Sequence, residues 1–167
     1  MLRNAAGCML PRSQHDAVLD RLQTKEVLRA VLHSILFHRL FGTVKPRTFE
    51  VLDVTMPGVD DDEITQQVEE KVDAFWRGVE GGANKRGQEE VPWEQWIINA
   101  EIRQPSDRER QKFEANLAAT LTKSLQTMLV HSSSEKGRSA VPLITNASSI
   151  SPFPIKMTVK VGGVEVA

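Results

Sequence analysis

The sequence has little cysteine and no long apolar run. The first shortage excludes a disulfide within the chain, and the second excludes a membrane-spanning helix. Cys8 is the single cysteine among 167 residues, so no disulfide can form within the chain. A reduced, cytoplasmic compartment is therefore expected. No stretch approaches the about 20 consecutive apolar residues that a membrane-spanning helix requires. We therefore expect no direct insertion into a membrane.

The sequence also has little net charge. Its 21 Lys and Arg residues nearly balance 22 Asp and Glu residues, and the pI is about 6.4. Nucleic acids and anionic membranes are bound through clustered cations, so neither is an expected partner. The composition, 40% hydrophobic and 26% charged, is typical of a globular protein. We expect a single domain over residues 15–167, preceded by a disordered extension over residues 1–14.

Motifs that carry catalysis are missing as well. No Gly-x-Ser-x-Gly elbow is present, and the glycine-rich segment 81–90 does not end in the Gly-Lys-Ser/Thr of a phosphate loop. His33 and His38 are five residues apart, about 140° around a helix, so they cannot share a metal as an i, i+4 pair can. The acidic run 60–63 complements a helix macrodipole without any cation. We therefore predict no catalytic residues, no metal site and no cofactor.

Residues 91–102, Val-Pro-Trp-Glu-Gln-Trp-Ile-Ile-Asn-Ala-Glu-Ile, predict a central strand. Apolar residues alternate with polar ones from Trp96 onward, as in a strand with one buried face. Because Pro92 lacks an N–H, the strand is expected to begin just after it. The tryptophans are expected to anchor a helix against a sheet.

Three long helical patterns surround this strand. A capping box, Ser-Asp-Arg-Glu, opens the clearest of them at Ser106. Residues 132–139 are expected to be a flexible linker. The predicted helices cover residues 24–39, about 60–79 and 106–131, and the predicted strands cover residues 16–20, 49–56 and 155–161 together with the central strand.

Helix 24–39 is apolar on two sides. One broad stripe includes Val27, Val31 and Ile35, and the far side carries His33 and Phe37 where a surface helix would be charged. Either another part of the fold or a partner protein covers this second side. From periodicity alone both explanations stay open.

Two segments together resemble the autophagy-related protein 101 family of the HORMA-domain superfamily. They are helix residues 27–39, Val-Leu-Arg-Ala-Val-Leu-His-Ser-Ile-Leu-Phe-His-Arg, and residues 91–96, Val-Pro-Trp-Glu-Gln-Trp. Strand 49–57 is most similar to fungal members. The resemblance implies an α+β HORMA domain in the open form, with three helices packed on a mainly antiparallel sheet. Little sequence follows strand 155–161, so we expect no C-terminal safety belt.

The resemblance also implies a function. Members of this family are non-catalytic subunits of the autophagy-initiation kinase complex, which contains a serine/threonine kinase and a scaffold, at the phagophore assembly site. They pair with the HORMA domain of autophagy-related protein 13 and stabilise it. Segment 81–90 has no aromatic residue, so recruitment through a Trp-Phe finger is not expected. The residues predicted to contact the partner are His33, Phe37, His38 and Arg39.

Two other functions fit the sequence. One is a HORMA adaptor of the checkpoint or DNA-repair kind, which closes over a peptide of its partner. The other is a small enzyme with an unfamiliar site, for which a concave pocket with convergent titratable side chains would be the sign.

Overall fold

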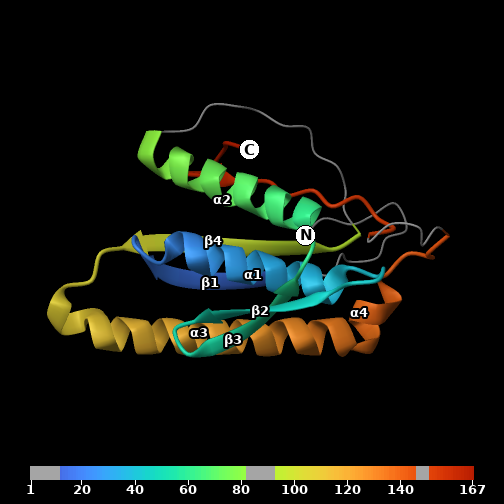
Figure 1. Ribbon diagram of the computed structural model, residues 1–167, viewed down its shortest axis with the longest axis horizontal. Coiled ribbons are helices and arrows are strands. Elements are labelled where there is room, and N and C mark those ends of the chain that lie inside the picture. The colour runs from blue at the N-terminus through green and yellow to red at the C-terminus, as the bar shows by residue number, and fades with distance from the viewer. Residues whose placement is uncertain (1–11, 82–92, 146–150) are drawn as a thin grey trace.

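The computed structural model of the protein describes residues 12–81, 93–145 and 151–167. Helix α1 and the strand pair β1–β4 run through the middle, with α2 on one side and α3 on the other (Figure 1). The elements, in chain order, are β1 Arg12–Asp20, α1 Thr24–Arg39, β2 Pro46–Val51, β3 Val54–Val59, α2 Asp62–Gly81, β4 Gln95–Arg103, α3 Asp107–Ser133, α4 Glu135–Ser139, β5 Lys160–Val161 and β6 Val164–Glu165.

Within the described ranges the strands form three two-stranded sheets rather than one mainly antiparallel sheet. The central pair, β1–β4, is parallel and runs in register from Arg12 opposite Gln95 to Asp20 opposite Arg103. The pairs β2–β3 and β5–β6 are antiparallel. Two helices and a hairpin separate β1 from β4, and such a long connection returns the chain to the same end of the sheet. The protein is therefore a mixed α/β protein with small sheets.

Both central strands differ from prediction at their first residues. Strand β1 begins at Arg12, so residues 12–14 belong to the fold and not to an extension. Residues 1–11, with Cys8, lie outside the described residues, as does segment 82–92. Strand β4 begins at Gln95, two residues later than expected. The side chains of Trp93 and Glu94, just before it, both contact Arg39 of α1 instead.

Segment 49–56 is not the single strand that its apolar content predicted. It contains parts of β2 and β3, which fold into a hairpin. The turn residues Leu52 and Asp53 both have positive φ, 48° and 61°. Two-residue turns of this kind are usually signalled by Asn-Gly or Asp-Gly, and Leu-Asp carries no such signal. The turn was therefore missed from the sequence.

Helix α1 spans the residues predicted for it and supplies much of the core. Its first residue, Thr24, donates a hydrogen bond of 2.7 Å from Oγ1 to the carbonyl oxygen of Asp20. This bond ties the helix to the end of β1. The buried apolar residues of the core come from β1, α1 with its C-cap Leu40, β2, β3, α2 and α3: Leu19, Val27, Leu28, Ala30, Val31, Ile35, Leu36, Leu40, Val51, Met56, Val59, Ile64, Val68, Val72, Leu117, Leu121 and Met128.

The capping box of α3 is confirmed, whereas the segments after this helix differ from prediction. Ser106 and Glu109 cap each other as the box requires. The expected linker 132–139 instead ends α3 and forms the short helix α4, which Ser134 caps by accepting a hydrogen bond from the Gly137 N–H. Of predicted strand 155–161, only the last two residues are strand, because β6 pairs with these alone.

Candidate functional site

The Trp-Glu-Gln-Trp motif lies where α1, β4 and α3 meet. The guanidinium of Arg39, the last residue of α1, donates two hydrogen bonds to the carboxylate of Glu94, one of them 2.6 Å long. The indole N–H of Trp96 donates to the same carboxylate, and Nε2 of His131 on α3 lies 3.4 Å from it. Side-chain exposure is only 10% for Arg39 and 4% for Glu94. We call these four residues the Glu94 network.

Aromatic rings surround this network. The ring of His15 on β1 stacks on Trp96, with centroids 5.6 Å apart and planes within 5°, and His131 meets Trp96 edge-on at 5.1 Å. The Arg39 guanidinium lies over the ring of Trp93. Sequence reasoning found the two tryptophans but missed the pairing of Arg39 with Glu94. The one sequence feature that could have indicated this pairing is the position of Glu94 between two tryptophans, where a carboxylate is enclosed by apolar rings.

The four residues predicted to contact a partner have different surroundings. His33 is fully buried, and its ring lies 4.8 Å from that of Phe49 on β2. The β2–β3 hairpin therefore covers the second apolar side of α1 at His33, where the sequence had left the covering element open. Phe37 and His38 are partly exposed. Arg39 belongs to the Glu94 network and is largely covered.

Burial keeps the histidines of α1 neutral. Loss of hydration lowers the pKa of His33, and the nearby Arg47 lowers it further. Loss of hydration also lowers the pKa of His38, with a second contribution from Arg39. Both side chains are therefore uncharged at neutral pH, when each imidazole has one N–H donor and one acceptor nitrogen.

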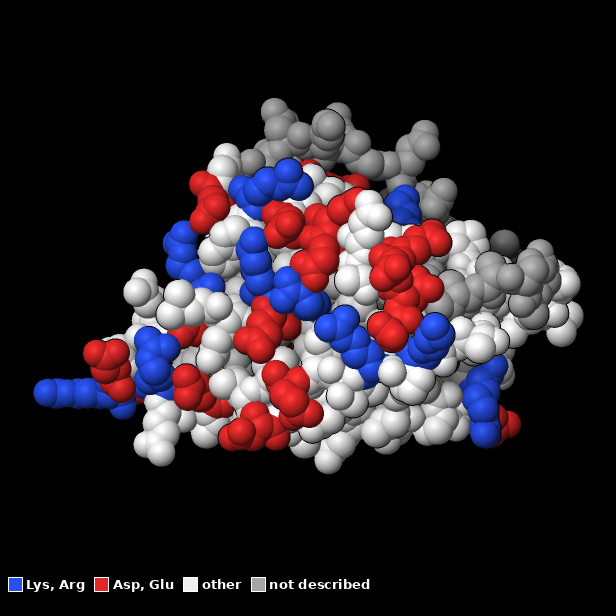
Figure 2. All heavy atoms as spheres, viewed as in Figure 1, with Lys and Arg blue, Asp and Glu red and all other residues white. Residues whose placement is uncertain are grey.

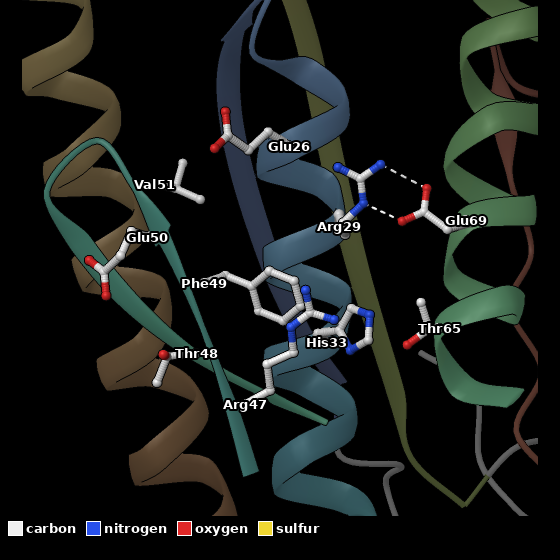
Figure 3. A pocket seen from close by; sticks show the side chains of 10 residues that line it. All are labelled: Glu26, Arg29, His33, Arg47, Thr48, Phe49, Glu50, Val51, Thr65 and Glu69. Atoms are coloured by element: carbon white, nitrogen blue, oxygen red, sulfur yellow. Dashed lines mark hydrogen bonds and ion pairs between the residues drawn. The ribbon is translucent and has the colours of Figure 1, made fainter. Parts of the chain in front are cut away.

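A cavity of about 490 Å³ opens between α1, β2 and the first turns of α2. Figure 3 shows Arg29 and Glu69 paired across one side of it, and Arg47 beside His33 near its centre. The residues that line it are Glu26, Arg29, His33, Arg47, Thr48, Phe49, Glu50, Val51, Thr65 and Glu69. Arrangements of charged side chains in a concave site are candidates for ligand binding.

Within residues 12–81, 93–145 and 151–167, no three His, Cys, Asp or Glu side chains lie close enough to hold a metal ion. No helix in these ranges is both long and apolar enough to cross a membrane. On the face drawn in Figure 2, acidic and basic side chains are interspersed.

The C-terminal end of α3 exposes apolar side chains. Leu129 is 54% exposed and Val130 is 68% exposed. Met128, directly before them, is by contrast fully buried. Adjacent exposed aliphatic residues beside a structured network are a candidate protein-binding surface.

Comparison with known proteins relates this chain to one family. The family model described as Autophagy-related protein 101 matches residues 16–88 and 83–148. Autophagy-related protein 101 of Arabidopsis thaliana is 28% identical over 109 residues, which are 53% of this chain and 51% of that protein. The protein of the same name from Schizosaccharomyces pombe is 35% identical over 100 residues, 49% of this chain and 54% of that protein.

The chain thus spans about half the length of the curated relatives it matches. The family model, in contrast, covers most of the chain, from β1 to beyond α4. It includes both segments on which the resemblance was based, and that resemblance is confirmed. The chain belongs to the autophagy-related protein 101 family.

Proposed function

We propose that the protein is a non-catalytic HORMA-domain subunit of the autophagy-initiation kinase complex, in the open form, and that it binds the HORMA domain of autophagy-related protein 13. Membership of the autophagy-related protein 101 family carries this proposal. In this role the protein stabilises its partner and, through it, joins the kinase and the scaffold at the phagophore assembly site. Its function then depends on an interaction surface and not on a catalytic pocket.

The Glu94 network supports a surface formed by the ends of two helices. Arg39 ends α1 directly after His38, and His131 on α3 directly follows Val130. Both Arg39 and His131 contact Glu94, so one buried carboxylate fixes the position of both helix ends. Buried networks of this kind hold side chains rigidly. A rigid surface loses little conformational entropy when a partner binds.

Two parts of this surface are accessible. Phe37 and His38 are partly exposed on α1, and Leu129 and Val130 are exposed on α3. Of the residues predicted from the sequence, His33 is enclosed by the hairpin and Arg39 is engaged by Glu94. We therefore propose that Phe37 and His38 contact the partner directly and that Arg39 acts by positioning them. His33 then serves the fold of the subunit.

Co-purification tests the proposal. The chain and the HORMA domain of autophagy-related protein 13 are mixed and passed over a sizing column with light-scattering detection. We expect one complex of one-to-one stoichiometry. Two separate peaks, from proteins shown by circular dichroism to be folded, would overturn the assignment of this partner.

A further inference from the structure

The cavity between α1, β2 and α2 contains a histidine without a polar partner. His33 is fully buried at its base, and neither Nδ1 nor Nε2 has a hydrogen-bond partner within the described residues. Nearly all buried polar atoms in proteins are hydrogen-bonded, and leaving one unpaired is costly. The volume, about 490 Å³, lies in the range of ligand-binding pockets. A ligand that accepts a hydrogen bond would relieve this cost.

A cation without a carboxylate partner lies beside this histidine. Arg47 makes no ion pair among the described residues, and its guanidinium lies 5.0 Å from the ring centre of Phe49. By contrast, Arg29 on the other side of the cavity is held by both oxygens of Glu69. Figure 3 shows the Arg47 guanidinium next to the His33 ring, with Thr65 facing them from α2. One free cation and one unpaired imidazole therefore adjoin the same space.

Three carboxylates and two guanidiniums line the cavity, and none of these carboxylates forms an ion pair with Arg47. Glu69 is neutralised by Arg29. Glu50 accepts hydrogen bonds from the Thr55 hydroxyl, and Figure 3 shows its carboxylate turned away from Arg47 and His33. The remaining carboxylate, of Glu26, lies toward the opposite end. A doubly charged phosphate would meet too much negative charge here, whereas a singly charged carboxylate matches one free cation.

We propose that this cavity binds the side-chain carboxylate of an acidic peptide segment in a partner protein, with Arg47 as its counter-ion and the His33 ring as a hydrogen-bond donor. Charge-assisted hydrogen bonds of this kind are stronger than neutral ones. The proposal does not depend on which protein carries the acidic segment. It therefore stands apart from the proposed partner.

Binding is expected to take up a proton. In the free protein, burial, Arg47 and Arg29 lower the pKa of His33, and Glu69 opposes them. A bound carboxylate next to the ring favours the protonated imidazole, so affinity increases as pH falls through the range in which His33 titrates. The charged groups that line the same cavity are Glu26 and Arg29 on α1, Arg47 and Glu50 on β2, and Glu69 on α2.

A titration followed by NMR tests the proposal on the whole chain. The ring signals of His33 are recorded while an acetylated, amidated glycine-glutamate-glycine peptide is added, and again with glutamine replacing glutamate. The matched variants are Arg47→Gln and Arg108→Gln. Both arginines are exposed and take no part in the ion pairs of the described residues, but Arg108 lies on α3, away from the cavity.

We expect the glutamate peptide to shift the His33 signals saturably and the glutamine peptide to leave them in place. Arg47→Gln is expected to weaken binding about tenfold because it removes the counter-ion, whereas Arg108→Gln leaves binding unchanged. The proposal is overturned if the two peptides act alike, if His33 does not respond, or if Arg47→Gln binds as well as the unmodified chain. Tighter binding of inorganic phosphate than of the peptide would overturn the choice of a carboxylate.

Discussion

Arg39 and Glu94 lie 55 positions apart in the sequence and form a nearly buried ion pair that joins the end of α1 to the start of β4. Replacement of Glu94 by Gln leaves the Arg39 guanidinium enclosed without a counter-charge. Removing one partner of a buried pair typically costs about 3 kcal/mol or more. We expect Glu94→Gln to lower the free energy of unfolding by this amount, measured by urea denaturation.

The control for this variant is an exposed ion pair. Arg103 and Glu101 pair on β4, with side chains 63% and 59% exposed. Exposed pairs contribute at most about 1 kcal/mol, so Glu101→Gln should change stability far less than Glu94→Gln. Equal losses in the two variants would show that the Glu94 network does not hold the helix ends together.

A second prediction concerns the contact between the hairpin and α1. Gly58 on β3 lies against the rings that fill this contact, and a Cβ there would overlap the Phe49 ring and lie 3.1 Å from Cβ of His33. Gly58→Ala should therefore displace Phe49 and lower the free energy of unfolding by about 1–3 kcal/mol. Thermal unfolding measures the loss.

Gly81 provides the matched substitution. It ends α2, and a Cβ at this position would meet nothing within 4 Å. Gly81→Ala should be neutral or slightly stabilising, because alanine loses less backbone entropy on folding than glycine does. If Gly58→Ala were equally harmless, the close packing of Phe49 over His33 would be wrong.

A third prediction is a loss of stability in mild acid. Burial lowers the pKa of His15, His33 and His38 below the ordinary value of 6.5. The unfolded chain therefore takes up protons first as pH falls, so these groups leave stability unaffected above about pH 7.5 and reduce it as pH drops through 6.5. The slope is at most about 1.4 kcal/mol per pH unit for each histidine.

This slope is checked by measuring urea midpoints between about pH 7.5 and about pH 5, the range in which histidines titrate. His15→Gln should flatten it, although the variant also loses the stacking on Trp96. The ion pair of Arg29 with Glu69 affects stability at lower pH. The hydrogen bond from Arg29 lowers the pKa of Glu69 below 4.5, so the stability that this pair contributes is lost only in stronger acid. A slope unchanged in His15→Gln would remove this histidine from the explanation.

A fourth prediction separates the two parts of the proposed partner surface. Aspartate at both Leu129 and Val130 should leave stability within about 0.5 kcal/mol, because these side chains are already exposed. The same change should weaken binding of the HORMA domain of autophagy-related protein 13 at least tenfold, measured by titration calorimetry. Leu22→Asp, at an 83% exposed residue between β1 and α1, should change neither quantity.

Phe37→Asp tests the α1 part of the same surface. Because Phe37 also packs against the core, its variant must first be shown to be folded. If it is, we expect a loss of binding of a few kcal/mol, as for an aromatic residue central to an interface. Unchanged affinity in Phe37→Asp, together with a loss in the α3 variant, would confine the interface to α3.

The helices could be predicted from the sequence because their signals are local. The apolar stripe of α1 and the Ser106 capping box each lie within a few turns, and both predictions agree with the structure. The pairing of β1 with β4 could not be predicted, since parallel register depends on contacts distant in sequence. The covering of His33 by the hairpin could not be predicted either, because the hairpin depends on the turn at Leu52, which has no sequence signal.

The candidate site was predicted only in part. The tryptophan motif was recognised as central, but the ion pair of Arg39 with Glu94 unites two segments that periodicity treats separately. His33 and Phe37 were grouped because they share a helix side, and periodicity carries no information on what covers that side. The free Arg47 was not singled out, because a lone arginine in a strand has no motif around it.

The parallel pairing of β1 with β4 also sets the order in which a newly made chain can fold. The two strands join residues such as Asp16 and Asn99, which are 83 positions apart. At ordinary rates of protein synthesis, about 5–20 residues per second, β4 is made several seconds after β1. During that interval α1 and the β2–β3 hairpin can already pack together, because their contacts are local. We therefore expect the hairpin and α1 to form the first stable unit. Strand β1, although synthesised first, is expected to pair only after β4 has been made.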